Sequence, residues 1–146
     1  MAEKQFTKMV WRDNMTFDAT TTTGHHLVVD APAPSGNDRG PKPIELLLTA
    51  LAGCTAMDVI SILKKKQEPV LGLEVYVEGK RANDHPMIYT DIEVVYRVTG
   101  DVKPESIARA IALSETKYCG AAAMLGKSAQ ITTRYEIIHE PELVAA

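Results

Sequence analysis

The chain has 146 residues, of which 45% are hydrophobic and 24% are charged, and its formal net charge is −3. This length suffices for one domain with a real core and is short for two, so we expect a single domain over residues 1–146. The small negative charge argues against a general affinity for nucleic acid or for an anionic membrane surface.

The N-terminal part of the chain predicts a meander of short antiparallel strands. Residues 15–20 alternate between apolar and polar side chains, and residues 6–11 do so imperfectly. A third short strand is expected at residues 26–29, and Asp13-Asn14 and Gly24 are turn signals between the strands. Residues 30–42 are rich in proline, glycine, asparagine and aspartate. They read as a loop within the domain, because the part before them is too short to fold alone.

A long helix is predicted over residues 43–66. Pro43 suits the first helical position, because its missing N–H has no intrahelical partner there. The segment is apolar almost all round, which predicts burial on more than one side. A chain of this size has few strands to cover such a helix, so we expect a homodimer with the helix near the interface.

The C-terminal half predicts a hairpin, a second helix and a final strand. These lie at 73–78 and 88–98 around an Asn83–Pro86 turn, at 104–119 with a further turn at 121–125, and at 129–137. Strands, helix, hairpin, helix and strand together indicate an α+β fold.

The compartment is indicated by two features of the sequence. The polar N-terminus lacks the apolar core of a signal peptide. Asp58 interrupts the longest apolar stretch, which argues against a membrane-spanning helix. We therefore expect a cytoplasmic protein that does not insert into a membrane.

Two cysteines, Cys54 and Cys119, are the residues most suited to chemistry. In a cytosolic chain they are either inert core thiols or one redox pair, since a disulfide scaffold is not expected there. The four histidines show no spacing typical of a zinc site, and we expect neither a metal nor another cofactor.

The segments around both cysteines resemble the OsmC/Ohr family, which comprises osmotically inducible protein C and organic hydroperoxide resistance proteins. Residues 40–54 (GPKPIELLLTALAGC) resemble the region of the family's first cysteine, and residues 113–119 (LSETKYC) resemble that of the second. The order of elements also matches along nearly the whole chain. The details look closest to the family's YhfA-like branch.

This resemblance implies an intertwined homodimer, with antiparallel sheets wrapped around long central helices. It also implies a thiol-dependent peroxidase that reduces organic hydroperoxides. Cys54 would attack the peroxide and become a sulfenic acid, and Cys119 would condense with it to a disulfide. An external dithiol would then reduce that bond, as lipoyl groups do for better-studied relatives.

Relatives of this type support the thiolate with an arginine that a glutamate holds. Arg12 is the favoured counterpart and Arg39 is the competitor, while either could be a solvated surface residue. Glu45 is the only carboxylate in the opening turn of the helix. At about 100° per residue it lies nearly opposite Cys54, so it is either the catalytic glutamate or a residue matched to the helix dipole.

Asp58 follows Cys54 by four residues, on the same helix face. A carboxylate there disfavours a thiolate, so either a cation neutralises Asp58 or Cys54 is a poor nucleophile. Two alternatives to the peroxidase therefore stay open. One is a dimer that binds a hydrophobic small molecule with little or no catalysis, and the other is a redox sensor.

Overall fold

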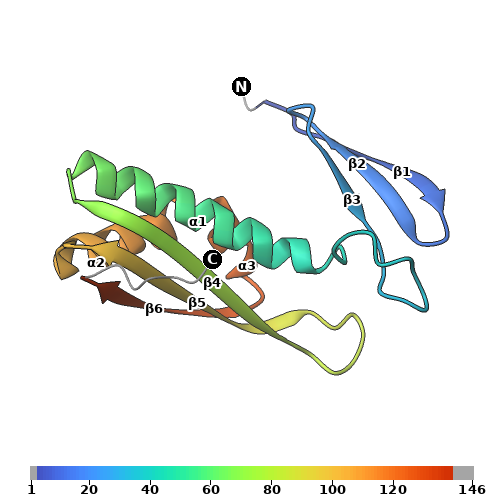
Figure 1. The fold of residues 1–146 in the computed structure, drawn as a ribbon. Coiled ribbons are helices and arrows are strands. Elements are labelled where there is room, and N and C mark those ends of the chain that lie inside the picture. Colours follow the sequence, from blue (N-terminus) through green and yellow to red (C-terminus); the bar gives the residue numbers. More distant parts are fainter. Residues whose placement is uncertain (1–2, 140–146) are drawn as a thin grey trace. The chain divides into compact units, whose positions relative to one another are not determined.

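The computed structural model describes residues 3–139. They fall into two compact units that divide between residues 47 and 48. The elements, shown in Figure 1, are β1 (Thr7–Asp13), β2 (Thr16–Thr21), β3 (His26–Val29), α1 (Glu45–Lys65), β4 (Val70–Arg81), β5 (Tyr89–Gly100), α2 (Pro104–Leu113), the π-helix η1 (Ser114–Tyr118), α3 (Gly120–Leu125) and β6 (Gln130–Ile138). The predicted α+β class is confirmed.

The first unit is the predicted antiparallel meander, with strand order β1-β2-β3. The loop after β3 is anchored on Asp30, which is only 2% exposed. Thr16 donates a hydrogen bond to this carboxylate at 2.7 Å, and the backbone amides of Ala31, Asn37 and Arg39 also donate to it. A buried carboxylate therefore has the partners that its charge requires.

The second unit contains a three-stranded sheet with the order β4-β5-β6. The predicted hairpin is confirmed, because β4 and β5 pair antiparallel. The expectation of purely antiparallel sheets is wrong at the other edge, where β6 pairs parallel with β5. The segment from α2 to α3 is a crossover that returns the chain to the end of the sheet at which β5 began.

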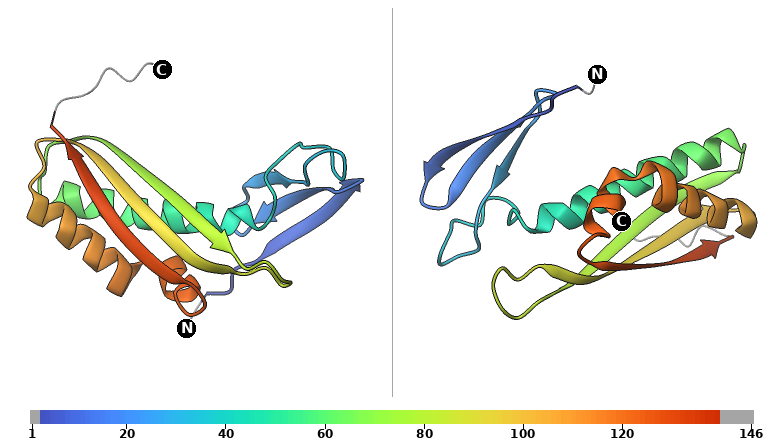
Figure 2. Two further views of the ribbon diagram at one scale, coloured as in Figure 1. Left: turned by 90° about the horizontal axis from the view of Figure 1, so that it is seen from below. Right: turned by 180° about the vertical axis from the view of Figure 1, so that it is seen from behind.

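One face of this sheet carries the helices α1 and α2 (Figure 2). The side chains of β5 on that face are almost completely buried, and they are Ile92, Val94, Tyr96 and Val98. They follow the alternation of a strand that has one face in the core. From α1, a stripe at every fourth position is buried, consisting of Leu51, Thr55, Val59 and Leu63.

α1 differs from its prediction in two ways. It begins at Glu45 and not at Pro43. Pro43 and Ile44 form a tight turn, in which their carbonyls accept hydrogen bonds from the amides of Leu46 and Leu47. Within the single chain it also buries one stripe and not several sides; Met57 is 73% exposed. By length and composition α1 could cross a membrane, but its buried stripe packs in the core of the second unit.

The second predicted helix is interrupted where the sequence suggested one continuous element. α2 ends at Leu113, and the next five residues form the π-helix η1. The predicted extra turn after Gly120 is confirmed as α3. A π-helical turn adds a residue to the helical repeat, so it changes the direction in which the following side chain points.

The start of α2 is fixed by Glu68, in the link between α1 and β4. Its carboxylate accepts hydrogen bonds from the Ser106 hydroxyl at 2.6 Å and from the Lys103 amide at 3.3 Å. The Ser106 bond is the main reason that the pKa of Glu68 lies below its ordinary value. The Lys103 amide, just before the first residue of α2, thereby gains a partner, and the two bonds together tie the start of α2 to the link that follows α1.

Candidate functional site

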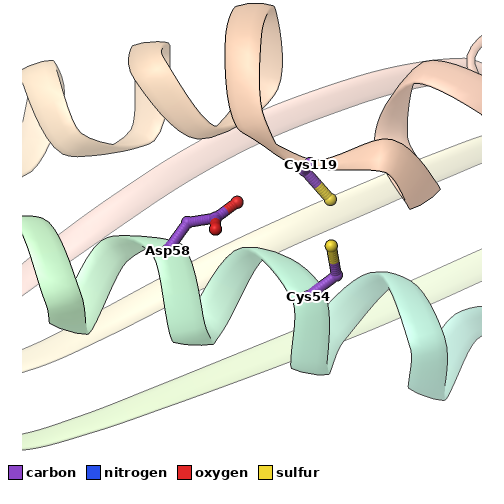
Figure 3. Close-up of side chains that lie close together, drawn as sticks. All are labelled: Cys54, Asp58 and Cys119. Atoms are coloured by element: carbon purple, nitrogen blue, oxygen red, sulfur yellow. The ribbon is translucent and has the colours of Figure 1, made fainter. Parts of the chain in front are cut away.

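The sulfurs of Cys54 and Cys119 converge in the second unit, although sixty-five positions separate them in the chain. Cys54 lies in the middle of α1, and Cys119 lies between η1 and α3. Both cysteines are free thiols. The two Sγ atoms and a carboxylate oxygen of Asp58 all lie within 4.8 Å of one another. Figure 3 shows the sulfurs pointing toward each other, with the Asp58 carboxylate beside them.

Cys119 is held by the backbone around it. Its amide donates to the Ser114 carbonyl at 2.8 Å, which closes the π-helical turn. Its Sγ accepts a hydrogen bond from the Ala122 amide at 3.3 Å. The residue is only 3% exposed. The sulfur is therefore oriented by η1 and α3 together.

The protonation of Cys119 follows from these surroundings. Burial raises the pKa of its thiol to about 11, and the hydrogen bond from Ala122 opposes this rise. The neighbouring Cys54 and Asp58 raise the pKa further. Cys119 is therefore a protonated thiol at neutral pH.

A buried chain of hydroxyl groups runs from Tyr96 to Asp58. The Tyr96 hydroxyl lies 2.6 Å from Thr55 Oγ1, which lies 2.8 Å from Ser114 Oγ, and Ser114 donates to Asp58 Oδ2 at 3.0 Å. Each hydroxyl group has one proton, and Ser114 gives its proton to Asp58, so the direction of the other two hydrogen bonds is determined. Tyr96 donates to Thr55, Thr55 donates to Ser114, and every hydroxyl proton points toward Asp58.

This chain joins strand β5, helix α1 and the π-helix at one place. Desolvation is the main reason that the pKa of Tyr96 is raised to about 12, so its hydroxyl keeps its proton. Because all three hydroxyl groups are satisfied, the chain is a rigid support for Asp58 next to the two sulfurs.

Sequence reasoning did not find Thr55, Ser114 or Tyr96 as a group. The sequence could have pointed to Thr55, because it is the only polar residue in the buried stripe of α1. A polar side chain at a core position needs a buried partner. The partners come from β5 and η1, so sequence spacing could not identify them.

A cavity of about 370 Å³ opens beside Asp58. Besides Asp58, its walls combine hydroxyl-bearing, apolar and cationic side chains, namely Ser61, Ile62, Lys65, Lys66, Leu113 and Tyr118. It is large enough for a small organic molecule. The site therefore combines two facing thiols, one oriented carboxylate and an adjoining cavity.

The other predicted site residues belong to the first unit or to its boundary. Arg12, on β1, forms an ion pair with Asp18, and Arg39 lies 3.7 Å from Asp13. Glu45 accepts a hydrogen bond from the Lys42 amide at 3.2 Å, as a residue in the opening turn of a helix can do. The roles of these three residues at the thiols stay predictions. Within residues 3–139, no basic side chain forms an ion pair with Asp58.

Comparison with known proteins places these features in a family context. The profile of the family described as OsmC-like protein matches residues 36–134. Protein YhfA of Escherichia coli strain K12 is 37% identical over 132 residues, which are 90% of this chain and 96% of YhfA.

Two solved structures illustrate the similarity in fold. A hypothetical protein from Aquifex aeolicus VF5 has a TM-score of 0.85 and 31% identity, with 96% of this chain and 100% of that chain covered. The organic hydroperoxide resistance protein OhrB of Bacillus subtilis has a TM-score of 0.66 and 13% identity, with 92% and 98% covered. At that identity the second likeness concerns the fold alone.

Proposed function

The chain belongs to the OsmC-like protein family, and on this premise we propose that it is a thiol-dependent peroxidase that reduces organic hydroperoxides. The observation that carries the proposal is the convergence of Cys54 and Cys119, whose sulfurs lie within 4.8 Å. Relatives of the same fold include proteins named for organic hydroperoxide resistance, which supports a role in peroxide chemistry.

The proposed reaction has three steps. The Cys54 thiolate attacks the O–O bond of the hydroperoxide and becomes a sulfenic acid, and the alkoxide takes up a proton and leaves as an alcohol. The Cys119 thiol then condenses with the sulfenic acid, which forms a disulfide and releases water. An external dithiol, such as a lipoyl group, finally reduces the disulfide and is itself oxidised.

The surroundings of the two sulfurs support this division of roles. Cys119 is buried, and its thiol keeps its proton at neutral pH, which suits a resolving thiol better than an attacking one. Cys54 is less buried and lies on the rigid helix α1. To form the disulfide, the two sulfurs have to close from within 4.8 Å to about 2 Å.

Arg12 and Glu45 complete the proposed catalytic group. In this proposal Arg12 favours the thiolate and orients the peroxide, Glu45 holds the arginine, and Arg39 is the alternative cation. We also propose a cytoplasmic homodimer, because α1 exposes apolar side chains that a second copy would cover.

The test of this proposal measures peroxide loss. The reduced protein is mixed with an alkyl hydroperoxide and a dithiol in the presence of a metal chelator. We expect Cys54→Ser to abolish consumption, and Cys119→Ser to accumulate a sulfenic acid that a sulfenate-specific probe labels. Ser128→Ala, at an exposed serine away from the site, is the control. Equal consumption by wild type and Cys54→Ser would end the enzyme proposal.

A second candidate function is favoured by Asp58. A carboxylate within 4.8 Å of both sulfurs disfavours a thiolate, which slows attack on peroxide. The chain would then be a binding or redox-sensing dimer that uses the cavity beside Asp58. Negligible peroxide turnover together with tight binding of a small hydrophobic ligand would support this alternative.

A further inference from the structure

We propose that Cys54, Asp58 and Cys119 form a binding site for a thiophilic divalent cation, and that Zn²⁺ is the ion that this donor set fits. The proposal concerns the reduced protein and does not rest on the peroxidase reaction. It differs from the expectation drawn from the sequence, in which no metal site was foreseen.

The identity of the donors is the first argument. Two thiolates and one carboxylate are ligands of Zn²⁺, and the pair of sulfurs excludes a preference for Mg²⁺ or Ca²⁺, which take oxygen ligands. Three protein ligands leave a fourth tetrahedral position for water or another small ligand. The donor set is therefore that of an open zinc site.

The distances between the donors are the second argument. The three ligand atoms already lie within 4.8 Å of one another. In a tetrahedral zinc site with Zn–S bonds of about 2.3 Å, neighbouring ligand atoms are about 3.5–3.8 Å apart. From that upper bound the donors need to close by about 1.0–1.3 Å, which side-chain rotations can achieve. Figure 3 shows the two sulfurs facing each other, with the Asp58 carboxylate beside them.

The support around the ligands is the third argument. Cys54 and Asp58 are one helical turn apart on α1, so the helix holds them at a constant separation. Ser114 donates to Asp58 Oδ2, and Thr55 and Tyr96 continue the chain behind it. Hydrogen bonds of this kind, from outside the ligand set, fix the orientation of metal ligands.

Charge is the fourth argument. A carboxylate and two thiols that face one another repel when they are ionised, and no basic side chain among residues 3–139 forms an ion pair with Asp58. A divalent cation at their centre turns this repulsion into attraction. Binding changes no oxidation state, because the cation takes the place of the thiol protons, which are released to solvent.

The experiment titrates the reduced, chelator-stripped protein with Cd²⁺, which replaces Zn²⁺ at thiolate sites and gives an ultraviolet thiolate-to-metal absorption. We expect saturation at one Cd²⁺ per chain, and displacement of the bound Cd²⁺ by an excess of Zn²⁺. Cys54→Ser and Cys119→Ser should each lower the absorption by about half or abolish it, because each removes one of two thiolate ligands.

The Asp58→Asn variant shows whether Asp58 is a third ligand of the metal or whether the two thiolates bind it alone. It should weaken Cd²⁺ binding by at least about tenfold, because even the loss of a group that only supports a metal ligand typically costs about 10–100-fold in affinity. Asp84→Asn, in the exposed turn of the β4–β5 hairpin, makes the same change of charge and should bind like the wild type. Circular dichroism checks that each variant is folded.

Two results would overturn the proposal. One is the absence of thiolate-to-cadmium absorption in the wild type at one equivalent of metal. The other is equal affinity in the wild type and in a folded Asp58→Asn variant. Since the readout is metal binding under reducing conditions, its failure would leave the peroxide assay unaffected, and a failed peroxide assay would leave this result standing.

Discussion

Asp30 illustrates how a single residue couples the stability of the first unit to pH. Burial by itself would raise the pKa of its carboxyl group, but hydrogen bonds from Thr16 and from the amides of Ala31, Arg39 and Asn37 together hold the pKa below its usual value. The folded carboxylate therefore binds a proton less readily than the unfolded one.

The sign of the pH effect follows from linkage. The stability that Asp30 contributes is fully present above the unfolded pKa of about 4, and it is lost as the pH falls through the lower folded pKa. We expect Asp30→Asn to lower the free energy of unfolding measured in urea at pH 7. Between pH 7 and pH 3, the free energy of unfolding of this variant should fall less than that of the wild type. Asp38→Asn, at an exposed neighbour, is the control. Equal pH profiles in wild type and Asp30→Asn would contradict this role.

Ser114 connects the hydroxyl chain to Asp58, and its side chain is completely buried. Ser114→Ala removes one donor to Asp58 and leaves the hydrogen of Thr55 without its acceptor. We expect a loss of about 1–3 kcal/mol in the free energy of unfolding, the usual effect of an unsatisfied buried polar group. Ser128→Ala, at an exposed position, should change it by less than about 0.5 kcal/mol. Similar free energies of unfolding for the two variants would show that the hydrogen-bonded hydroxyl groups add little stability.

At the scale of elements, β4 depends on a close approach at Gly79. A Cβ atom there would lie 2.7 Å from Tyr89 Cδ1 and 3.1 Å from Leu48 Cδ2, so the ring of the neighbouring strand and the side chain of α1 leave no room for it. The missing side chain lets α1 lie close to the β4–β5 hairpin.

We expect Gly79→Ala to lower the free energy of unfolding by about 1–3 kcal/mol through overpacking. Gly72→Ala in the same strand is a matched control, since its nearest neighbours are 3.7 Å away. Chemical denaturation of both variants measures the difference. If Gly79→Ala were as stable as Gly72→Ala, Tyr89 or Leu48 would have to move aside freely. The close contact at Gly79 would then contribute nothing to the choice of glycine there.

The π-helix η1 is the element that brings Cys119 to Cys54. A regular α-helix continued from α2 would place residue 119 in a different direction, and the extra residue of η1 changes it. The element boundary at Leu113 therefore determines where Cys119 lies relative to Cys54.

At the scale of the whole molecule, the proposed homodimer is tested through α1. Met57 is 73% exposed on this helix, and Leu47 is 42% exposed. Met57→Glu would place an unpaired charge in an interface formed by this face, which is unfavourable. We expect the wild type to sediment as a dimer in analytical ultracentrifugation, and Met57→Glu to weaken association at least tenfold.

The control for this prediction is Ala108→Glu, which adds the same charge at an exposed position of α2. Its dimerisation should match that of the wild type. A monomeric wild type, or equal association in both variants, would contradict an interface built on α1.

The amino-acid sequence by itself determined the elements, since periodicity, prolines and turn residues are local signals: three short strands, a long apolar helix, a hairpin, a second helix and a last strand. It also determined the family, because the segments around Cys54 and Cys119 are specific. Where local geometry departs from a simple repeat, as at the start of α1 and at η1, the sequence signal was too weak to place the boundary.

Only the tertiary structure decided which side chains meet. The parallel pairing of β6, the contact between the sulfurs of Cys54 and Cys119, and the hydroxyl chain from Tyr96 to Asp58 all join residues that are far apart in the chain. Such contacts are set by how helices pack on a sheet, and sequence spacing carries no information on the distance between residues of different elements. The physical reason is that hydrophobic burial is non-directional, whereas the geometry of a site depends on atoms placed within an ångström.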